Sequence, residues 1–323
     1  MLAPFELLMP RTLAEALKML ADVGPAAQPI AGGTNVLVDV RAGHCRPAAL
    51  VDVGRLAELA GIRQENGCLA IGAGVTIAGL LADPLVAAHA ALLRQAAAVF
   101  ANPLIRNRAT VGGNLADASP AADCAPPLLA LDAEVELVST AGARRVALAH
   151  FFPGVRQTVR RPDELLVAVR WPLRGGVGAF HKLGLRRADA ISVVSAAVMV
   201  DFGPRAAAGQ QQTPGIETAR IALGAVAPCP LRATAAEEFL AGRRLTPDAI
   251  TEAARLATAA VRPISDIRGP AEYRERMVEV IVKRLLGHIG EQQGLRSRDR
   301  QPQITRTPGI LNHATHEHLR HPR

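Results

Sequence analysis

Residues 110–123 read TVGGNLADASPAAD and hold an adjacent pair of glycines among hydroxyl, amide and carboxylate side chains. Side chains of these kinds can hydrogen-bond the phosphate, ribose and ribityl oxygens of a dinucleotide. The same device stands at residues 29–36, PIAGGTNV, where an apolar strand is predicted to run into two glycines and then a helix. Adjacent glycines let backbone N–H groups approach a phosphate, and the following helix N-terminus adds positive potential. Two such turns predict one dinucleotide held from both sides.

A structural role is the alternative for each turn, because a Gly-Gly turn between a strand and a helix more often serves the fold. An irregular loop ending in an Asp-capped helix at Ala125 would also explain the polar residues of 110–123, but not the repeated glycine pair. The stretch GAGVTI at residues 72–77 begins like a dinucleotide-binding fingerprint. Ile77 replaces its third glycine, so a tight turn is predicted there instead.

The composition argues against a nucleic-acid partner. The 323 residues are 49% hydrophobic and 20% charged, which is typical of a globular chain, but only 3% are aromatic, too few for base-stacking platforms. The net charge is +8, of which six arginines and three acidic residues from Glu291 onward supply +3. The remaining charge is spread over stretches of mixed sign, which indicates a basic solvated surface.

The four cysteines are too far apart for a local metal site. Cys45, Cys68, Cys124 and Cys229 form no CxxC pair, so an iron–sulfur cluster or structural zinc is expected only on another chain. Neither a signal peptide nor a membrane span is predicted. A cytoplasmic protein with reduced thiols is expected.

The first half of the chain alternates short strands and helices. Strands are predicted at residues 5–9, 28–31, 49–53, 68–71, 134–138 and 164–171, and helices at residues 12–20, 36–41, 76–81 and 85–100. Residues 102–125 lack periodicity and are predicted to form an ordered or functional loop. The pattern predicts the α+β class.

Arg174, Gly175 and Gly176 mark a predicted domain boundary. Beyond it, residues 180–185, 191–202 and 216–225 predict a three-stranded antiparallel sheet, with 206–214 as a hairpin connection. Helices are predicted from Pro247 and over residues 273–287. The division is therefore 1–174, 175–290 and a tail, 291–323, that is predicted to be disordered alone. Its irregularly spaced His313, His316, His318 and His321 indicate a solvated segment rather than a metal site.

The sequence resembles the FAD-binding medium subunit of the molybdenum hydroxylases, the family of carbon monoxide dehydrogenase and xanthine dehydrogenase. The resemblance rests on AGGTN at 31–35, TVGGNLADASPAADCAPPLLALDA at 110–133, Lys182 with RRAD at 186–189, and DIRG at 266–269 followed by Tyr273 and Arg274. It covers about residues 2 to 288. It implies two α+β lobes that clasp FAD, the vanillyl-alcohol-oxidase/CO-dehydrogenase flavoprotein type, and then a three-stranded sheet with helices.

The resemblance also implies the site. The implied cofactor contacts are Pro29, Ile30, Ala31, Gly32, Gly33, Thr34, Asn35, Val36, Phe100, Thr110, Val111, Gly112, Gly113, Asn114, Asp123, Leu166, Lys182, Asp189 and Ile191. Ile191 falls where the family places a residue beside the isoalloxazine, aromatic in some members and aliphatic in others. Core packing is the alternative for Phe100, Leu166 and Ile191. A surface ion pair is the alternative for Lys182 and Asp189.

The implied function is electron relay. In the family, a large subunit hydroxylates the substrate at a molybdenum cofactor, and a small subunit with two [2Fe–2S] clusters passes electrons to the FAD, in a dimer of heterotrimers. A self-contained flavin oxidoreductase and a non-catalytic assembly protein are the alternatives. The first would need its own substrate base, and GxSxG, HExxH and P-loop motifs are all absent from the sequence. Noncovalent FAD is expected, and valine at either Gly33 or Gly113 is expected to abolish its binding.

Overall fold

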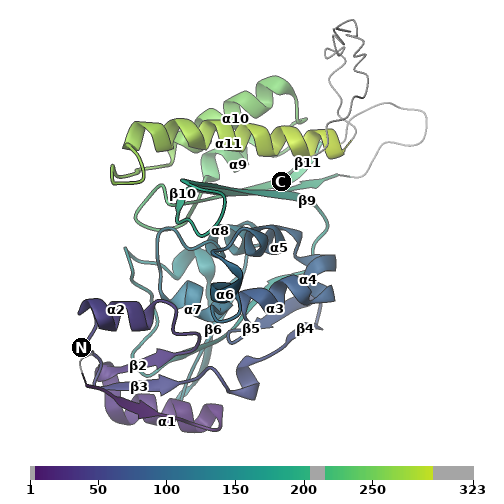
Figure 1. Ribbon diagram of the computed structural model, residues 1–323. Helices are drawn as coiled ribbons and strands as arrows, with labels where there is room; N and C mark the ends of the chain where they lie inside the picture. Colours follow the sequence, from purple (N-terminus) through teal and green to yellow (C-terminus); the bar gives the residue numbers. More distant parts are fainter. Residues whose placement is uncertain (1–3, 204–214, 294–323) are drawn as a thin grey trace, which may run out of the picture.

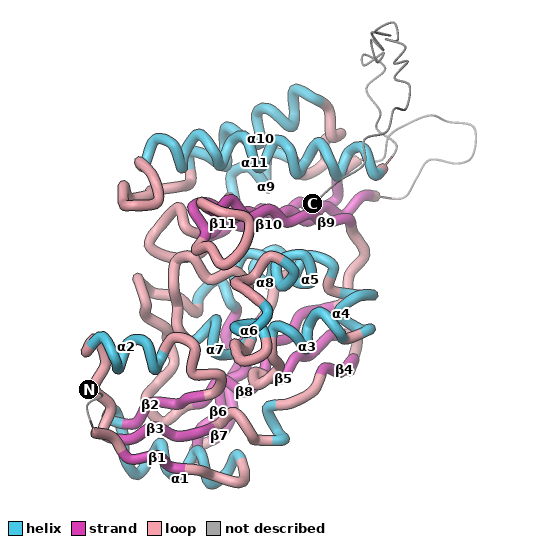
Figure 2. The backbone as a smooth tube through the Cα atoms, viewed as in Figure 1, coloured by secondary structure: helices cyan, strands magenta, loops and turns pink. Residues whose placement is uncertain are grey.

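The computed structural model describes residues 4–203 and 215–293. The predicted connection at 206–214 lies outside these residues, as does the predicted tail apart from its first three positions. Three sheets lie one above another, with helices between the second and third and a further helical layer on the third (Figures 1 and 2). The N-terminal lobe (residues 4–53) carries the first sheet, and the central lobe (residues 54–174) carries the second.

The N-terminal lobe is a small parallel sheet with strand order β1-β3-β2. Its elements are β1 (Glu6–Leu8), α1 (Leu13–Val23), β2 (Ala27–Ile30), α2 (Val36–Ala42) and β3 (Ala49–Asp52). Thr12 caps α1, as predicted, by accepting a hydrogen bond from the Glu15 amide at 3.2 Å. The face of α1 formed by Ala16, Leu17 and Leu20 is buried. It packs with β3 against Leu165 and Val167, so this lobe is seated on the central one.

The central lobe is a five-stranded antiparallel sheet with strand order β4-β5-β8-β6-β7. Its strands are β4 (Ile62–Glu65), β5 (Cys68–Gly72), β6 (Glu134–Ser139), β7 (Gly142–Ala147) and β8 (Leu165–Pro172). Of these strands, β4 and β7 were not predicted from the sequence. Both are edge strands without a buried residue, so neither carries the apolar signal by which strands are recognised.

The helices of the central lobe differ from the prediction in two places. They are α3 (Ile77–Ala82), α4 (Pro84–His89), α5 (Ala91–Ala98), α6 (Pro103–Arg106), α7 (Val111–Ala116) and α8 (Ala125–Ala130). The single helix predicted over 85–100 is broken at Ala90, whose φ of −136° and ψ of 46° are not helical. The loop predicted over 102–125 contains α6 and α7, and each is capped by a polar side chain, Asn102 and Thr110. Helices this short leave little periodicity in a sequence.

The C-terminal sheet has four strands rather than three, in the order β12-β11-β10-β9. Its strands are β9 (Val177–Gly184), β10 (Ser192–Phe202), β11 (Ile216–Gly224) and β12 (Leu231–Arg232), followed by α9 (Thr234–Leu240), α10 (Pro247–Ala259) and α11 (Ala271–Gln292). The added strand is only two residues long, too short for a sequence pattern. Pro247 occupies the first turn of α10, as predicted.

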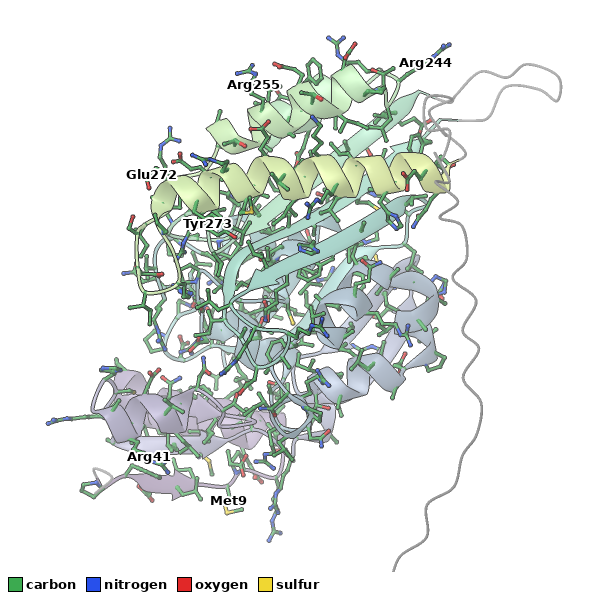
Figure 3. The ribbon with its side chains drawn as sticks, turned by 45° about the horizontal axis from the view of Figure 1, so that its top comes forward. Met9, Arg41, Arg244, Arg255, Glu272 and Tyr273 are labelled. Atoms are coloured by element: carbon green, nitrogen blue, oxygen red, sulfur yellow. The ribbon has the colours of Figure 1, made fainter. Side chains whose placement is uncertain are left out.

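Two cores lie on opposite faces of the C-terminal sheet. Its outer face packs against α9, α10 and α11, while Ala197 and Ala222 join the core of the central lobe. Arg255 and Glu272, on the outer helices, extend into solvent in Figure 3. None of the helices in the described ranges is long and apolar enough to cross a membrane. The α+β class and the order of two lobes followed by a sheet with helices agree with the prediction.

Candidate functional site

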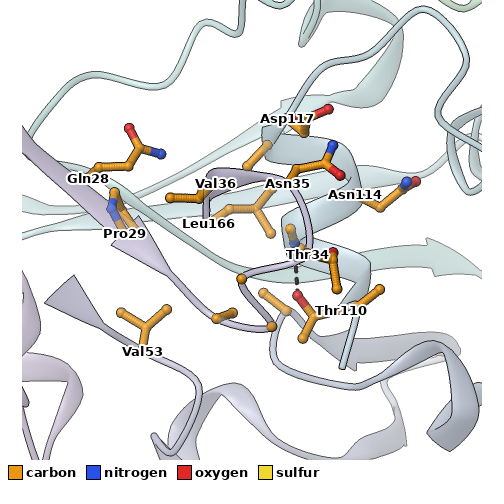
Figure 4. A pocket seen from close by; sticks show the side chains of 18 of the residues that line it. Gln28, Pro29, Thr34, Asn35, Val36, Val53, Thr110, Asn114, Asp117 and Leu166 are labelled. Atoms are coloured by element: carbon orange, nitrogen blue, oxygen red, sulfur yellow. Dashed lines mark hydrogen bonds between the residues drawn. The ribbon is translucent and has the colours of Figure 1, made fainter. Parts of the chain in front are cut away.

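A cleft of about 380 Å³ lies between the N-terminal and central lobes, within the range of small-molecule sites. Figure 4 shows Gln28, Pro29 and Val53 on one side of it, and Thr110, Asn114 and Asp117 on the other. Of the predicted contacts, thirteen line this cleft: Pro29, Ala31, Gly32, Gly33, Thr34, Asn35, Val36, Phe100, Thr110, Gly112, Gly113, Asn114 and Leu166. The two glycine turns, far apart in the sequence, thus meet at one cavity.

The first turn (residues 31–36) presents backbone donors to the cleft. Gly33 has a φ of +72°, a left-handed conformation that glycine adopts without strain. Within residues 4–203 and 215–293, the N–H groups of Gly33, Thr34 and Asn35 donate to no protein acceptor. Backbone donors without a protein partner beside a cavity are suited to an anionic or polar ligand.

The second turn (residues 110–114) is closed by protein hydrogen bonds. Thr110 caps α7 by accepting from the Gly113 N–H at 3.0 Å. The N–H groups of Val111 and Gly112 donate to the carbonyls of Val75 and Ala73, at 3.0 and 2.9 Å, and that of Asn114 donates to Thr110 at 2.9 Å. The side chain of Asn114 accepts from the Cys124 amide at 3.1 Å. The N–H groups of residues 111–114 are therefore used within the protein, and these four residues offer side chains rather than free N–H groups to the cleft.

The first glycine of each pair makes room for the chain itself. A Cβ on Gly32 would lie 1.9 Å from the carbonyl oxygen of Arg108, and a Cβ on Gly112 would lie 2.5 Å from the Cβ of Ala73. Gly32 thus brings the first turn against the backbone just ahead of the second. The structural role weighed from the sequence thus applies to the first glycine of each pair, although the sequence gives no sign of which atoms approach it.

The stretch at residues 72–77 contributes to the cleft, although only a tight turn was predicted for it. Ala73 and Gly74 line the cavity. A Cβ on Gly72 would lie 2.2 Å from the carbonyl oxygen of Leu59, so this glycine serves packing. Thr76 forms an isolated bridge with Thr110, which joins this stretch to the second turn. Gly72 and Gly74 are the sequence signal by which this part of the cleft could have been predicted.

Charged residues at the cleft were also missed. Arg156 donates through Nη2 to Asp39 at 2.5 Å and to Asp117 at 3.0 Å, and all three residues line the cavity. Arg160 lines it too, but its guanidinium donates to three carbonyls, of which Glu164 is the nearest at 2.7 Å. Burial lowers the pKa of Arg160. Both arginines lie in an irregular segment with no motif around it.

Asp123 and Lys182 form a buried pair outside the cavity lining. The Lys182 ammonium lies 2.5 Å from one carboxylate oxygen of Asp123, and Ser192 donates to the other at 2.8 Å. Burial raises the pKa of Asp123, and Lys182 opposes this rise. Two alternatives weighed from the sequence are wrong. Lys182 is not in a surface ion pair, and α8 begins after Cys124 without a side-chain cap from Asp123.

The other predicted contacts lie around the cleft rather than on its lining. Ile30 is half-buried and Val111 is fully buried behind it. Asp189 lies at the surface, 3.6 Å from Arg186, and its amide donates to the Ala101 carbonyl next to Phe100. Ile191 is 64% exposed, so core packing does not account for it. Phe100 and Leu166 belong to the core and also line the cleft, so the two predicted roles coincide.

The described residues contain no group of three or more histidine, cysteine or acidic side chains arranged to hold a metal ion. Cys124 is buried at the second turn, and this burial strongly raises the pKa of its thiol. Cys45 is the thiol among the residues lining the cleft. The cleft is lined by the free N–H groups of the first turn, by uncharged side chains and by the two arginines and two aspartates named above, a set that is suited to binding a nucleotide.

Comparison with known proteins agrees with this geometry. Residues 3–174 match a family model described as the FAD binding domain in molybdopterin dehydrogenase, and residues 179–289 match the CO dehydrogenase flavoprotein C-terminal domain. The carbon monoxide dehydrogenase medium chain of Hydrogenophaga pseudoflava is 34% identical over 284 residues, which cover 87% of this chain and 96% of the relative. The xanthine dehydrogenase FAD-binding subunit of Escherichia coli O157:H7 is 34% identical over 281 residues, covering 85% and 92%.

Solved structures agree as well. A chain of the carbon monoxide dehydrogenase from Hydrogenophaga pseudoflava superposes with a TM-score of 0.84 at 33% identity, covering 90% of this chain and 99% of that one. A chain of quinoline 2-oxidoreductase from Pseudomonas putida 86 gives a TM-score of 0.83 at 32% identity, covering 91% and 99%.

Proposed function

Since the chain belongs to the FAD-binding medium subunits of the molybdenum hydroxylases, we propose that it relays electrons from [2Fe–2S] clusters of a small partner subunit, through FAD, to an external acceptor. A large partner subunit carries the molybdenum cofactor and selects the organic substrate. Assembly as a dimer of heterotrimers and a cytoplasmic location are parts of the same proposal. FAD supplies a carrier that accepts two electrons and releases them singly or in pairs.

The observation that carries the proposal is the first turn. Gly33, Thr34 and Asn35 line a cavity between two lobes, and their N–H groups have no acceptor among the described residues. The oxygens of a diphosphate are negatively charged hydrogen-bond acceptors, which is the kind of partner that these N–H donors need. Asn114 and Thr110 add neutral polar groups on the opposite side. The residues present therefore fit FAD.

The site residues form part of the proposal in two groups. The thirteen residues that line the cleft would hold the diphosphate and the adjoining sugar and ribityl groups. Asp123, Lys182, Asp189 and Ile191 would serve the flavin end, where loop residues 185–191 approach Phe100 through the Asp189–Ala101 hydrogen bond. Ile30 and Val111 do not line the cleft, and they would contribute by holding the backbone of the two turns in position. A domain boundary near Arg174 is supported by the separate family models on either side.

An absorbance spectrum beside an activity assay tests the proposal. The full chain, purified alone, is expected to show a flavin band and no hydroxylase activity, and to acquire a role when co-expressed with an iron–sulfur and a molybdenum subunit. Co-purification of a tagged chain with iron and molybdenum would support the assembly. A flavin band with unaided substrate oxidation would favour a self-contained flavoenzyme, whereas the absence of a flavin band would favour an assembly protein.

A further inference from the structure

Arg156 lines the cleft and joins the two lobes by an ion pair. Its backbone is fixed on the central lobe, where its amide donates to the Ala118 carbonyl at 3.1 Å. Its φ of +55° is a left-handed conformation that costs a non-glycine residue free energy and needs support from its surroundings. Asp117, beside the end of α7, holds the guanidinium at 3.0 Å. The backbone of Arg156 and one of its ion pairs thus belong to the central lobe, and its guanidinium is left in position to contact the N-terminal lobe.

Asp39 receives this arginine on the N-terminal lobe. It lies in α2, directly after the first turn, and its side chain is 20% exposed. Its carbonyl accepts from the amides of His44 and Cys45, so the segment that brings Cys45 to the cleft is attached to the same residue. The His44 ring nitrogen lies 3.7 Å from the second carboxylate oxygen, but His44 is 75% exposed. Asp39 is therefore held in place at the cleft, where its carboxylate accepts the hydrogen bond from Arg156.

The lobes share a hydrogen bond from the Leu13 amide to the Glu58 carboxylate, at 2.9 Å, and the ion pair between Asp39 and Arg156. Among residues 4–174, as far as the structure describes them, it is the one ion pair that joins residues 4–53 to residues 54–174. The lobes also share an apolar core, in which Ala16 and Leu20 pack with Leu165 and Val167 of β8. The lobes are thus joined by an apolar core, by the close approach of Gly32 to the Arg108 backbone, and by one ion pair at the cleft.

We propose that the contacts among Arg156, Asp39 and Asp117 form an ionic clasp that retains the bound cofactor by holding the two lobes closed over the cleft. The inference rests on the proposed binding of FAD between these lobes. Because the cavity is lined from both lobes, a nucleotide held there leaves more easily when they separate. Arg156 acts in this as a positioning residue, since its guanidinium is already shared by two carboxylates.

The clasp is tested by the rate of FAD release from the full, FAD-loaded chain. Free FAD is captured by an excess of a flavin-binding scavenger, and release is followed by the loss of bound-flavin absorbance. Arg156→Gln and Asp39→Asn are each expected to release FAD about two- to five-fold faster at low salt, the range that a half-exposed ion pair supplies. The double variant is expected to match either single variant, because both remove the same contact.

Salt and conservative replacement provide further readouts. In about 0.5 M NaCl the wild-type rate is expected to rise toward that of Arg156→Gln, because the pair is exposed enough to be screened. Arg156→Lys, which keeps the charge, is expected to be intermediate. Arg63→Gln is the matched control, because Arg63 is 53% exposed and pairs with Glu65 at 3.1 Å without lining the cleft. It is expected to release FAD at the wild-type rate.

The outcomes separate the clasp from the function on which it rests. A wild-type chain that holds no FAD overturns the proposed function. A wild-type chain that holds FAD, with Arg156→Gln and Asp39→Asn both releasing it at the wild-type rate, overturns the clasp alone. Additive acceleration in the double variant also overturns it. Circular dichroism of each variant identifies a change in rate that comes from unfolding, and the salt dependence of the wild type tests the clasp without any substitution.

Discussion

In the first turn the N–H groups of Gly33, Thr34 and Asn35 have no acceptor among the described residues, whereas in the second turn those of residues 111–114 all donate to protein oxygens. The two segments share a glycine pair followed closely by an asparagine. One leaves its donors for a ligand, and the other uses them to fix a short helix against residues 73–76. A repeated motif therefore need not mean a repeated role, since the free donors decide what each copy can bind.

Gly32→Ala is expected to have the largest effect on stability and FAD binding, because it disrupts the close contact between the first turn and the backbone that precedes the second turn. The new methyl group would lie 1.9 Å from the Arg108 carbonyl, and backbone must move to relieve this. The free energy of unfolding should fall by about 3 kcal/mol or more, with FAD lost as well. Chemical denaturation measures this. Gly287→Ala is the control, because no atom outside its own helix lies within 4 Å of the added Cβ, and a small gain of about 0.5–1 kcal/mol is expected because alanine favours a helix interior.

Gly33→Val separates binding from folding. A β-branched residue at a φ of +72° is strained by about 1–3 kcal/mol, and its Cβ would lie 3.2 Å from the Leu37 side chain. Shifting the turn misaligns its N–H donors, and losing two charge-assisted hydrogen bonds corresponds to about a 100-fold fall in FAD affinity. Flavin titration with circular dichroism measures both effects. Near-native circular dichroism with stoichiometric FAD would exclude the first turn as the main binding element.

Gly113→Val is the matching change in the second turn, and a smaller effect is expected. The added Cβ would lie 2.9 Å from the Thr110 hydroxyl oxygen, which displaces the cap of α7. Loss of such a cap costs about 1 kcal/mol. FAD affinity should fall by less than about ten-fold. The sequence alone predicted equal losses for valine at Gly33 and Gly113, so equal losses in the same titration would restore the symmetrical two-turn interpretation.

Acid precipitation is expected to release all of the flavin, because no covalent bond holds FAD to the chain. Substitution of a cleft thiol is therefore expected to have the smallest effect of these changes. The thirteen predicted contacts that line the cleft offer N–H groups and uncharged side chains, although Cys45 lines it too. A colourless pellet and a yellow supernatant are expected for wild type and for Cys45→Ser alike. A yellow wild-type pellet that becomes colourless in Cys45→Ser would mean that a thioether, rather than the first turn, anchors the flavin.

Much of the fold could be predicted because its buried faces are periodic. The apolar stripe of α1 and the alternating burial of β6 have the 3.6- and 2-residue periods of a helix and a strand. By contrast, β7 is an exposed edge strand, and the break at Ala90 falls in an alanine-rich run in which neither neighbour disfavours a helix. These elements are set by tertiary contacts, which leave no local signal.

The site could be predicted where it is built from turns, and not where it depends on contacts between distant segments. The glycine pairs marked both sides of the cleft, and thirteen of the predicted contacts line it. Arg156 was missed because its partners, Asp39 and Asp117, lie 117 and 39 positions away in the sequence. The buried state of Lys182 was missed for the same reason, since an isolated lysine is usually a surface residue.

Asp123 lies in the part of the chain that matches the FAD-binding family model, whereas Lys182 and Ser192 lie in the part that matches the C-terminal one. An exchange of halves between two such proteins would keep each fold and yet separate a buried carboxylate from both of its partners. A buried charge without its partner costs about 3–5 kcal/mol, enough to unfold many domains. Working hybrids, whether natural or engineered, are therefore expected to inherit these three residues from one parent or as a compatible set.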